Sequence, residues 1–460
     1  MSDSDALHLV GARVLDPSLS LDAVRTIVVQ SGVIAEISDA GFSATADAAQ
    51  IDCTGMVLCP GFIDPHVHLR EPGELHKETL ATGLAAAAAG GFTAVAAMPN
   101  TLPPLDDPAR VRALIDSAAR ACGVRCYPIA AVSMGRAGEA LAPLRSMATA
   151  GAVAFSDDGC CTRSLKTLYH AARLCADMPQ PFMSHCDDVS FSGALMHEGE
   201  LSDYLGVAGS PSLSEAAIAA RDLLVAQATG KTWHICHVSA KETLQVLRWA
   251  QSLGIRASGE VTPHHLHLTD ESLRRFDARY RVNPPLRARE DVSAMRQAVR
   301  ERTIRIFASD HAPHAEEDKQ PPLSHACTGF SGLETAVGAT FEALRGVPLD
   351  VMVENYSSNV AGLLNVRGGT LAPGSPADIT GLYLQRPWTV NAQAFKSKGR
   401  NSAFAGLTFQ VRPALTIVAG RIVYAPEGMV PPQTTAPAYA RGSRAELQAH
   451  GAELRGRLHA

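Results

Sequence analysis

The chain has 460 residues, of which 46% are hydrophobic and 19% are charged, and its formal net charge is -5. This composition supports a large packed core and excludes global disorder, and the absence of a basic stripe argues against nucleic acid as a partner. The polar, acidic start Met1-Ser2-Asp3-Ser4-Asp5 is unlike a secretory signal, and the ten cysteines include no CxxC pair, so we expect a reduced, cytoplasmic protein.

The first predicted element is a hairpin over residues 26–37, in which two β-rich runs flank a Ser31-Gly32 turn. A strand ending in Asp64-Pro65-His66-Val67-His68 follows. Residues i and i+2 of a strand point to the same side, so both imidazoles can face one metal ion. The alternative is two ordinary histidines on a strand face.

The stretch Thr79–Leu105 carries no charged residue and is long enough to suggest a membrane span. It is rich in alanine and glycine, however, and Gly90-Gly91 interrupts it. We therefore predict a helix over about 79–89 and a buried strand over 92–98 that leads to Asn100, and we expect no membrane segment.

Polar residues follow several further β-rich runs, and segments such as 165–176 and 214–229 between those runs have helical patterns. This repeat is typical of a parallel β/α fold, and a (β/α)8 barrel carries its active site at the C-terminal ends of its strands. The predicted strand ends, in chain order, are His66 and His68, Asn100, Ala131-Val132, Asp158, His185, His237, Glu260 to Thr262, and Asp310.

A second hairpin, over residues 415–424 around Ala419-Gly420, resembles the first. We therefore predict an α/β protein: a (β/α)8 TIM-like barrel with a small β-sandwich domain built from both chain ends. The barrel spans residues 60–364, and the β domain combines 1–59 with 365–428. Residues 429–460 are predicted to be a tail, with a proline-rich linker from Pro431 and a possible surface helix.

Several motifs, taken together and in this order, resemble the class I dihydroorotases of the amidohydrolase superfamily over nearly the whole chain. They are Asp64 to Gly73, Met98-Pro99-Asn100-Thr101, Ser156-Asp157-Asp158-Gly159, His185-Cys186-Asp187, His237-Val238-Ser239, Val282 to Arg287, and Ala308 to His314 with Lys319.

The resemblance implies two zinc ions per subunit. One would be held by His66, His68 and Asp310 and the other by His185 and His237, with Asp158 as the bridge. Asp158 is chosen over Asp157 by resemblance alone. Related hydantoinases and allantoinases bridge their metals with a carboxylated lysine, and the nearest lysine here, Lys166, falls in a predicted helix.

The implied reaction is the reversible closure of N-carbamoyl-L-aspartate to (S)-dihydroorotate in de novo pyrimidine (UMP) biosynthesis. Metal ions supply an activated hydroxide and polarise the carbonyl, and Asp310 is the predicted proton shuttle. The resemblance assigns further substrate contacts to His68, Arg70, Asn100, Asn283, His314, and the backbone around Thr328 and Gly329.

Other polar residues are expected to have structural roles. His264, His265 and His267 are predicted to support the site rather than to bind metal, and His234 to pack in the core. Lys319 is expected to position a loop. The chain departs from the family pattern at Cys160-Cys161-Thr162, at Thr328 and at Ile304-Arg305-Ile306. None of these residues is a predicted metal ligand.

Two other functions stay open at this point. One is a hydantoinase or allantoinase, which Arg70 and the lack of a bridging lysine disfavour. The other is a non-catalytic dihydroorotase-like subunit of aspartate carbamoyltransferase, which the full set of metal histidines disfavours. The resemblance also leads us to expect a homo-oligomer, and docking of an active enzyme onto aspartate carbamoyltransferase is compatible with it.

Overall fold

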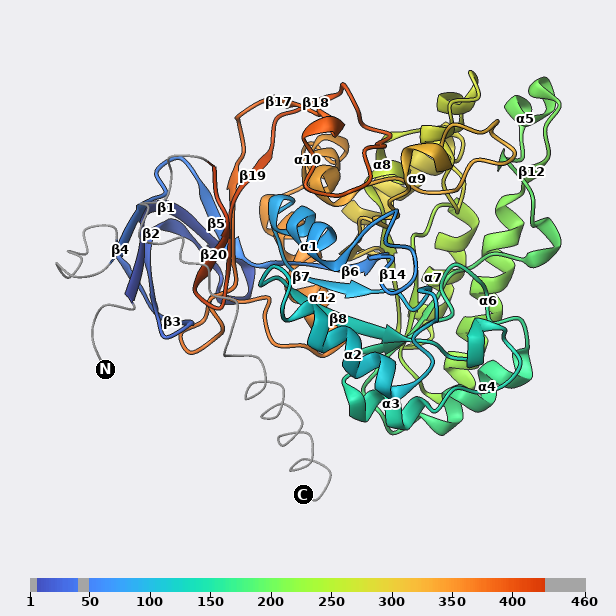
Figure 1. The fold of residues 1–460 in the computed structure, drawn as a ribbon, viewed down its shortest axis with the longest axis horizontal. Coiled ribbons are helices and arrows are strands. Elements are labelled where there is room, and N and C mark those ends of the chain that lie inside the picture. Colours follow the sequence, from blue (N-terminus) through green and yellow to red (C-terminus); the bar gives the residue numbers. More distant parts are fainter. Residues whose placement is uncertain (1–5, 40–48, 427–460) are drawn as a thin grey trace.

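The computed structural model describes residues 6–39 and 49–426, so the predicted tail from Pro431 lies outside the described residues. Figure 1 shows two parts, a β sheet on the left and a larger β/α barrel on the right. In the described part of the chain, no helix is both long and apolar enough to cross a membrane.

Eight parallel strands form the barrel, in the spatial order β15-β14-β13-β10-β9-β8-β7-β6. They are β6 (Phe62–Val67), β7 (Phe92–Ala97), β8 (Arg125–Ala130), β9 (Ala154–Phe155), β10 (Phe182–Ser184), β13 (Trp233–Ile235), β14 (Ala257–Val261) and β15 (Ile306–Phe307). The order along the sheet is the order along the chain, as a (β/α)8 barrel requires. The predicted strand ends agree with these bounds to within a few residues.

The first and last strands of this series close the barrel through backbone contacts beyond β15. Val67 forms an isolated parallel bridge with His311, and the backbone N–H of His68 donates to the carbonyl of His311 at 2.8 Å. The buried carboxylate of Asp64 accepts from the backbone N–H of Ser309 at 3.2 Å. These contacts bring the two segments that carry His68 and Asp310 side by side.

Helices connect and surround the strands. They are α1 (Leu80–Ala89), α2 (Pro108–Ala118), α3 (Leu144–Ala150), α4 (Leu165–Leu174), α5 (Glu200–Leu205), α6 (Ser212–Thr229), α7 (Lys241–Ser252), α8 (Pro263–His267), α9 (Arg289–Arg300), α10 (Leu333–Ala343), α11 (Leu349–Tyr356) and α12 (Ser358–Leu364). The charge-free stretch forms α1 and β7, as predicted. Thr79 caps α1 by accepting from the N–H of Thr82, and the helix ends at Gly90.

Apolar side chains fill the barrel interior below the strand ends. Ile63, Ile129, Met183 and Ile306 point inward from four strands, and α12 adds Leu364 to the same cluster. A packed interior of this kind closes one end of the barrel, so polar chemistry is confined to the other end.

Strands from the two chain ends, which were predicted to join, form one sheet in the order β20-β19-β16-β5-β1-β2-β3, with β4 paired to β1. They are β1 (Ala6–Asp16), β2 (Leu21–Gln30), β3 (Val33–Asp39), β4 (Ala49–Asp52), β5 (Val57–Pro60), β16 (Ile379–Tyr383), β19 (Arg412–Val418) and β20 (Arg421–Tyr424). Both predicted hairpins are present, as β2–β3 and β19–β20.

Two short strand pairs lie outside these sheets. They are β11 (Met196–His197) with β12 (Gly209–Ser210), and β17 (Trp388–Thr389) with β18 (Thr408–Phe409). The chain leaves the terminal sheet after β16 and returns to it at β19, and the part between β17 and β18 runs beside α10 (Figure 1).

Candidate metal centre

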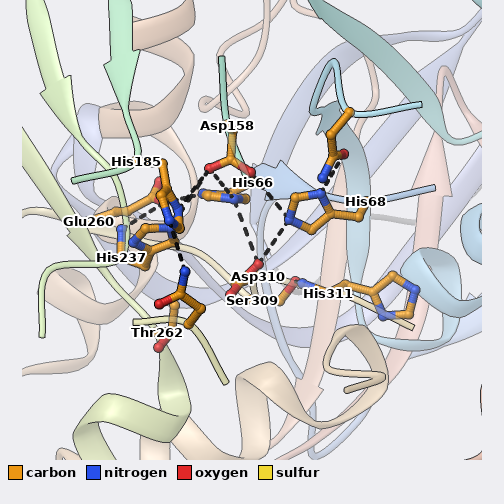
Figure 2. Close-up of polar contacts among 12 residues, drawn as sticks. His66, His68, Asp158, His185, His237, Glu260, Thr262, Ser309, Asp310 and His311 are labelled. Atoms are coloured by element: carbon orange, nitrogen blue, oxygen red, sulfur yellow. Dashed lines mark hydrogen bonds and ion pairs between the residues drawn. The ribbon is translucent and has the colours of Figure 1, made fainter. Parts of the chain in front are cut away.

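Six buried side chains from the ends of β6, β9, β10, β13 and β15 meet in one place (Figure 2). They form two adjacent sets, His66, His68 and Asp310 in one and Asp158, His185 and His237 in the other, and within each set the potential ligand atoms all lie within 4.8 Å of one another. Each residue lies at the C-terminal end of a barrel strand or just after it. The structure therefore brings together all six residues that the sequence singled out as metal ligands.

The carboxylate of Asp158 lies between the two sets. Its Oδ1 is 3.5 Å from Nδ1 of His185 and 3.7 Å from Nε2 of His237. The same Oδ1 is 3.4 Å from Nε2 of His66, whereas Oδ2 is 3.6 Å from Nε2 of His68. Oδ1 thus lies close to histidines of both sets and Oδ2 close to His68, so the carboxylate spans the gap between the sets, as a bridging carboxylate must.

The neighbouring carboxylate of Asp157 has a different environment. Its Oδ1 accepts from the backbone N–H groups of Val132 at 3.0 Å and Ser133 at 3.1 Å. Its Oδ2 accepts from the hydroxyls of Ser133 at 2.7 Å and Thr162 at 2.8 Å. Asp157 therefore ties two loops together, and only Asp158 faces the histidines.

Several atoms of the cluster are buried without a hydrogen-bond partner among the described residues. They include Nε2 of His66 and Oδ1 of Asp158. Leaving such groups unpaired costs roughly 1–3 kcal/mol each, which a bound cation would remove. Imidazole nitrogens and carboxylate oxygens around one point are a donor set that suits zinc, so the residues present fit a metal centre.

Glu260, near the end of β14, contacts two histidines of the cluster, His66 and His237. Its Oε1 lies 2.7 Å from Nδ1 of His66 and accepts from the backbone N–H of His237 at 3.1 Å. Its Oε2 lies 3.0 Å from Nε2 of His234, which is buried as predicted. Burial acts to raise the pKa of Glu260, but the charge of His66 and the hydrogen bond with His234 lower it to about 2.

No role in the site was predicted for Glu260. Its position could have marked it as a site residue. It is an acidic residue near the end of the seventh barrel strand, where no metal ligand was assigned. The C-terminal ends of β6, β9, β10, β13 and β15 carry the histidines and aspartates of the cluster.

Asp310 is the carboxylate of the first set. Its Oδ1 is 3.1 Å from Nε2 of His68 and 3.7 Å from Nε2 of His66. Burial acts to raise the pKa of Asp310, but the hydrogen bond with His68 and the charge of His66 outweigh it, and the pKa lies below its usual range. These neighbours therefore favour the ionised form of the Asp310 carboxyl.

Three site residues have a left-handed backbone: Arg70 with φ 60°, His237 with φ 32° and Asp310 with φ 48°. This conformation costs a non-glycine residue on the order of 1–3 kcal/mol and is concentrated at functional sites. Hydrogen bonds of the surrounding loops hold these residues in place.

Arg70 and His314 lie together beside the cluster, and we call the region around these two side chains the basic pocket. The Nε of Arg70 donates to the carbonyl of Pro313 at 3.2 Å, and an Nη2 of the same guanidinium is 3.4 Å from Nε2 of His314. The His314 ring donates to the carbonyl of Thr328 at 2.8 Å. Burial and the charges of Arg70 and Lys319 lower the pKa of His314 to about 2, so its ring is neutral.

The loop at Thr328 and Gly329 is held by two cations. The Nζ of Lys319 donates to the carbonyl of Cys327 at 2.7 Å, as a loop-positioning role predicts. The Gly329 N–H donates to the carbonyl of Arg281 at 2.9 Å, so this N–H is already engaged. Arg281 in turn donates to the carbonyl of Ala326 at 2.7 Å.

Two asparagines contact histidines of the cluster rather than one another. Oδ1 of Asn100 lies 2.8 Å from Nδ1 of His68, and Nδ2 of Asn283 lies 3.1 Å from Nε2 of His185. Both contacts are on the ring nitrogen opposite the one that faces Asp158, so each asparagine orients a histidine of the cluster and lies at the edge of the site.

The remaining histidines after β14 do not belong to these sets. His265 is 2.7 Å from the hydroxyl of Thr262 and 3.1 Å from the carbonyl of Pro284, which is a structural role. Among the described residues, the one further set of close potential ligands adds Cys236 to His66 and Asp158. None of the sets includes His264, His265 or His267.

Comparisons with known proteins agree on the class of protein. A family model described as dihydro-orotase-like matches residues 55–243. A dihydroorotase of Syntrophus aciditrophicus is 41% identical over 419 residues, which are 90% of this chain and 98% of that protein. A dihydroorotase of Pelotomaculum thermopropionicum is 42% identical over 426 residues, which are 91% and 98% of the two chains.

Solved structures of cyclic-amide hydrolases have the same fold. The L-hydantoinase (dihydropyrimidinase) of Arthrobacter aurescens superposes with a TM-score of 0.83 at 26% identity, and the match covers 92% of this chain and 97% of that one. A D-hydantoinase of Thermus sp. has a TM-score of 0.78 at 22% identity, with 93% and 97% covered, and supports the fold alone.

Proposed function

The chain belongs to the dihydroorotase family, and from this membership we propose its reaction, its metal ligands and its substrate contacts. The protein is a metal-dependent cyclic amidohydrolase. The reaction assigned to it is the reversible cyclisation of N-carbamoyl-L-aspartate to (S)-dihydroorotate, a step of pyrimidine (UMP) biosynthesis. Identity near 40% over about nine tenths of the chain carries this assignment.

The proposed metal centre holds two zinc ions. His66, His68 and Asp310 would hold one, His185 and His237 the other, and Asp158 would bridge them. The observation in support is that the Asp158 carboxylate lies close to histidines of both sets, 3.4 Å from His66 and 3.5 Å from His185. When bound, zinc supplies water activation at neutral pH and polarisation of the ring carbonyl.

Asp310 is the proposed proton shuttle. Its ionised carboxylate would accept the proton of the attacking water and deliver it to the departing ring nitrogen. In the biosynthetic direction it would take the proton from the carbamoyl nitrogen. Its Oδ1 lies 3.1 Å from Nε2 of His68, so the carboxylate is placed beside the first set of proposed ligands.

The basic pocket is the proposed site for the substrate carboxylate. Arg70 offers a planar fork that matches a carboxylate, and the ring of His314 lies beside it. Asn100 and His68 complete this side of the pocket. On the other side, Asn283 and the backbone at Thr328 and Gly329 would contact the pyrimidine ring.

The alternative functions are less well supported. A hydantoinase of related type would use a carboxylated lysine as bridge, but Lys166 lies exposed on α4. A non-catalytic subunit has no need of a complete cluster, and all six proposed ligands converge here. We also propose a cytoplasmic homo-oligomer that can dock onto aspartate carbamoyltransferase, which co-purification and sedimentation of the two proteins would test.

The direct test combines an analysis of metal content with an assay of dihydroorotate hydrolysis. Purified protein is expected to contain about two zinc ions per chain and to hydrolyse dihydroorotate, with activity lost on chelation and restored by zinc. Zinc-loaded protein that leaves dihydroorotate intact, and does not cyclise carbamoyl-aspartate, would overturn the assignment.

A further inference from the structure

The chain between β17 and β18 includes an extended segment, residues 395–404, that we call the C-terminal strap. Along the strap, inward and outward residues alternate. Phe395, Ser397, Gly399 and Asn401 are buried, whereas Lys396, Lys398 and Arg400 are exposed. Phe404, at the end of the strap, packs against Phe330 with ring centroids 5.8 Å apart. The strap therefore rests on the barrel loops along one face.

Two acidic side chains, Glu78, which is buried, and Glu334, which is partly buried, anchor the first half of the strap. Oε1 of Glu334, in the first turn of α10, accepts from the backbone N–H groups of Lys396 at 2.7 Å and Ser397 at 3.1 Å. Glu78, just before α1, accepts from the backbone N–H of Lys398 at 3.0 Å and from the Ser397 hydroxyl. These anchors fix the position of the strap at the end of the barrel that carries the metal centre.

The second half of the strap contacts the basic pocket directly. The Nδ2 of Asn401 donates to the backbone carbonyl of His314 at 2.8 Å. The backbone carbonyl of Asn401 accepts from the N–H of Ser331 at 2.9 Å, and the Ser331 hydroxyl donates to the carbonyl of Gly399 at 3.0 Å. Asn401 thus joins the loop of His314 to the loop that follows Thr328 and Gly329.

Gly399 brings the strap backbone against the same loop. A Cβ atom at this position would lie 2.5 Å from Oγ of Ser331, 2.9 Å from Cβ of Pro313 and 3.2 Å from the carbonyl oxygen of His314. Pro313 also accepts the hydrogen bond from Nε of Arg70. A side chain at position 399 would therefore push the strap away from the loop on which both Arg70 and His314 depend.

We propose that Asn401 is a positioning residue for substrate recognition, which acts through His314 and sets the distance between the two loops of the carboxylate pocket. The inference rests on the proposed function, because it takes this pocket as the carboxylate site. Asn401 lies far from the barrel loops in sequence and does not touch the metal cluster. Loss of its amide is therefore expected to affect recognition of the carboxylate more than the chemical step.

The test is steady-state kinetics of Asn401→Ala and Gly399→Ala on dihydroorotate, with metal content and melting temperature measured alongside. The matched control is Asn359→Ala. The Nδ2 of Asn359 also donates to a backbone carbonyl, that of Arg305, at 2.9 Å. Arg305 directly precedes β15, so this contact lies at the opposite end of the barrel from the metal centre. A double-mutant cycle of Asn401→Ala with His314→Ala measures whether the two residues act together.

We expect KM for dihydroorotate to rise about 5- to 100-fold in both strap variants, the range for a buried group left without its partner. We expect kcat to stay within about threefold, metal content to be unchanged, and Asn359→Ala to match the wild type. In the cycle, Asn401→Ala is expected to add little to the loss caused by His314→Ala.

An unchanged KM in both strap variants, or a lower kcat or melting temperature without a change in KM, would overturn the inference. So would effects of Asn401→Ala and His314→Ala that simply add. A wild-type protein that does not act on dihydroorotate would instead refute the proposed function, so the two failures are distinguishable.

Discussion

Glu260 holds Nδ1 of His66 at 2.7 Å, on the side of the ring opposite the nitrogen that faces Asp158. An ionised carboxylate can only accept, so Nδ1–H of His66 donates a hydrogen bond to Glu260. The lone pair of Nε2 is then directed into the cluster. Carboxylates in this position fix the tautomer of a metal ligand and increase its basicity. His234 holds the second oxygen of Glu260, so the carboxylate cannot rotate away.

Replacing this carboxylate is expected to weaken metal binding. Glu260→Gln keeps the size of the side chain but removes its charge, so we expect metal affinity to fall by about 10- to 100-fold. Competition with a chelator measures this change, and Glu301→Gln, at an exposed site, is the control. Wild-type affinity in Glu260→Gln would show that the carboxylate does not support the cluster.

Replacing Asp310 by asparagine is expected to reduce turnover by at least about 100-fold, because the amide cannot accept the proton. The side chain keeps its shape, and its oxygen can still contact His68. The measurement is kcat of the metal-loaded variant, with metal content determined on the same sample. Near-normal turnover at full metal occupancy would eliminate Asp310 as the proton shuttle.

Assembly of the metal centre is expected to need no carbon dioxide, because Asp158 is a carboxylate already. Protein stripped by a chelator should regain full activity when zinc is added in bicarbonate-free buffer. A requirement for bicarbonate, or electron density for a carboxylated lysine at the site, would contradict the proposed bridge.

Arg70 is expected to determine the preference for a ring that carries a carboxylate. Arg70→Met should leave the metals bound but cost about 2–5 kcal/mol in kcat/KM for dihydroorotate, the range for removing one partner of a buried charge pair. Dihydrouracil lacks the carboxylate, so it should be a poor substrate of both proteins. Arg305→Met, at an exposed position, is the control. A wild type that prefers dihydrouracil would contradict the proposed specificity.

Glu334 is expected to make stability depend on pH. Burial raises its pKa from 4.5 to about 7, although the N–H groups of Ser397 and Lys396 lower it. The stability that its protonated form contributes is complete below about pH 4.5 and is lost as the pH rises through about 7.

Glu334→Gln keeps the acceptor oxygen but removes the charge. It should therefore be more stable than the wild type at pH 8, by up to about 3 kcal/mol, and this difference should shrink at pH 4.5. Denaturant unfolding at both pH values measures the effect, with Glu316→Gln, which is exposed, as the control. An equal difference at the two pH values would mean that the carboxyl does not titrate in this range.

Much of the fold and of the cluster could be predicted because local sequence carries the signal. Most barrel strands are short apolar runs that lead to a polar residue, and His66 and His68 have the period of a strand. The choice between Asp157 and Asp158 could not be made in this way, since the two are adjacent. It depends on hydrogen bonds from Ser133 and Thr162, which only the folded loops provide.

Contacts between distant parts of the chain were not predictable from local patterns. The hydrogen bond of Asn401 to His314 joins residues 87 positions apart, and nothing near Asn401 in sequence marks it as part of a pocket. Glu260 was missed for another reason, because a lone acidic residue at a strand end has no spacing motif to identify it.

The junction between the terminal sheet and the barrel limits how this protein can be divided. Only Gly61 separates β5, which pairs with β1 and β16, from β6, which carries His66. A barrel expressed alone would lose the strands on both sides of β5, next to its first metal-binding strand, and expose edges that favour aggregation. Protein engineers who want a smaller catalyst therefore cannot treat the terminal sheet as removable.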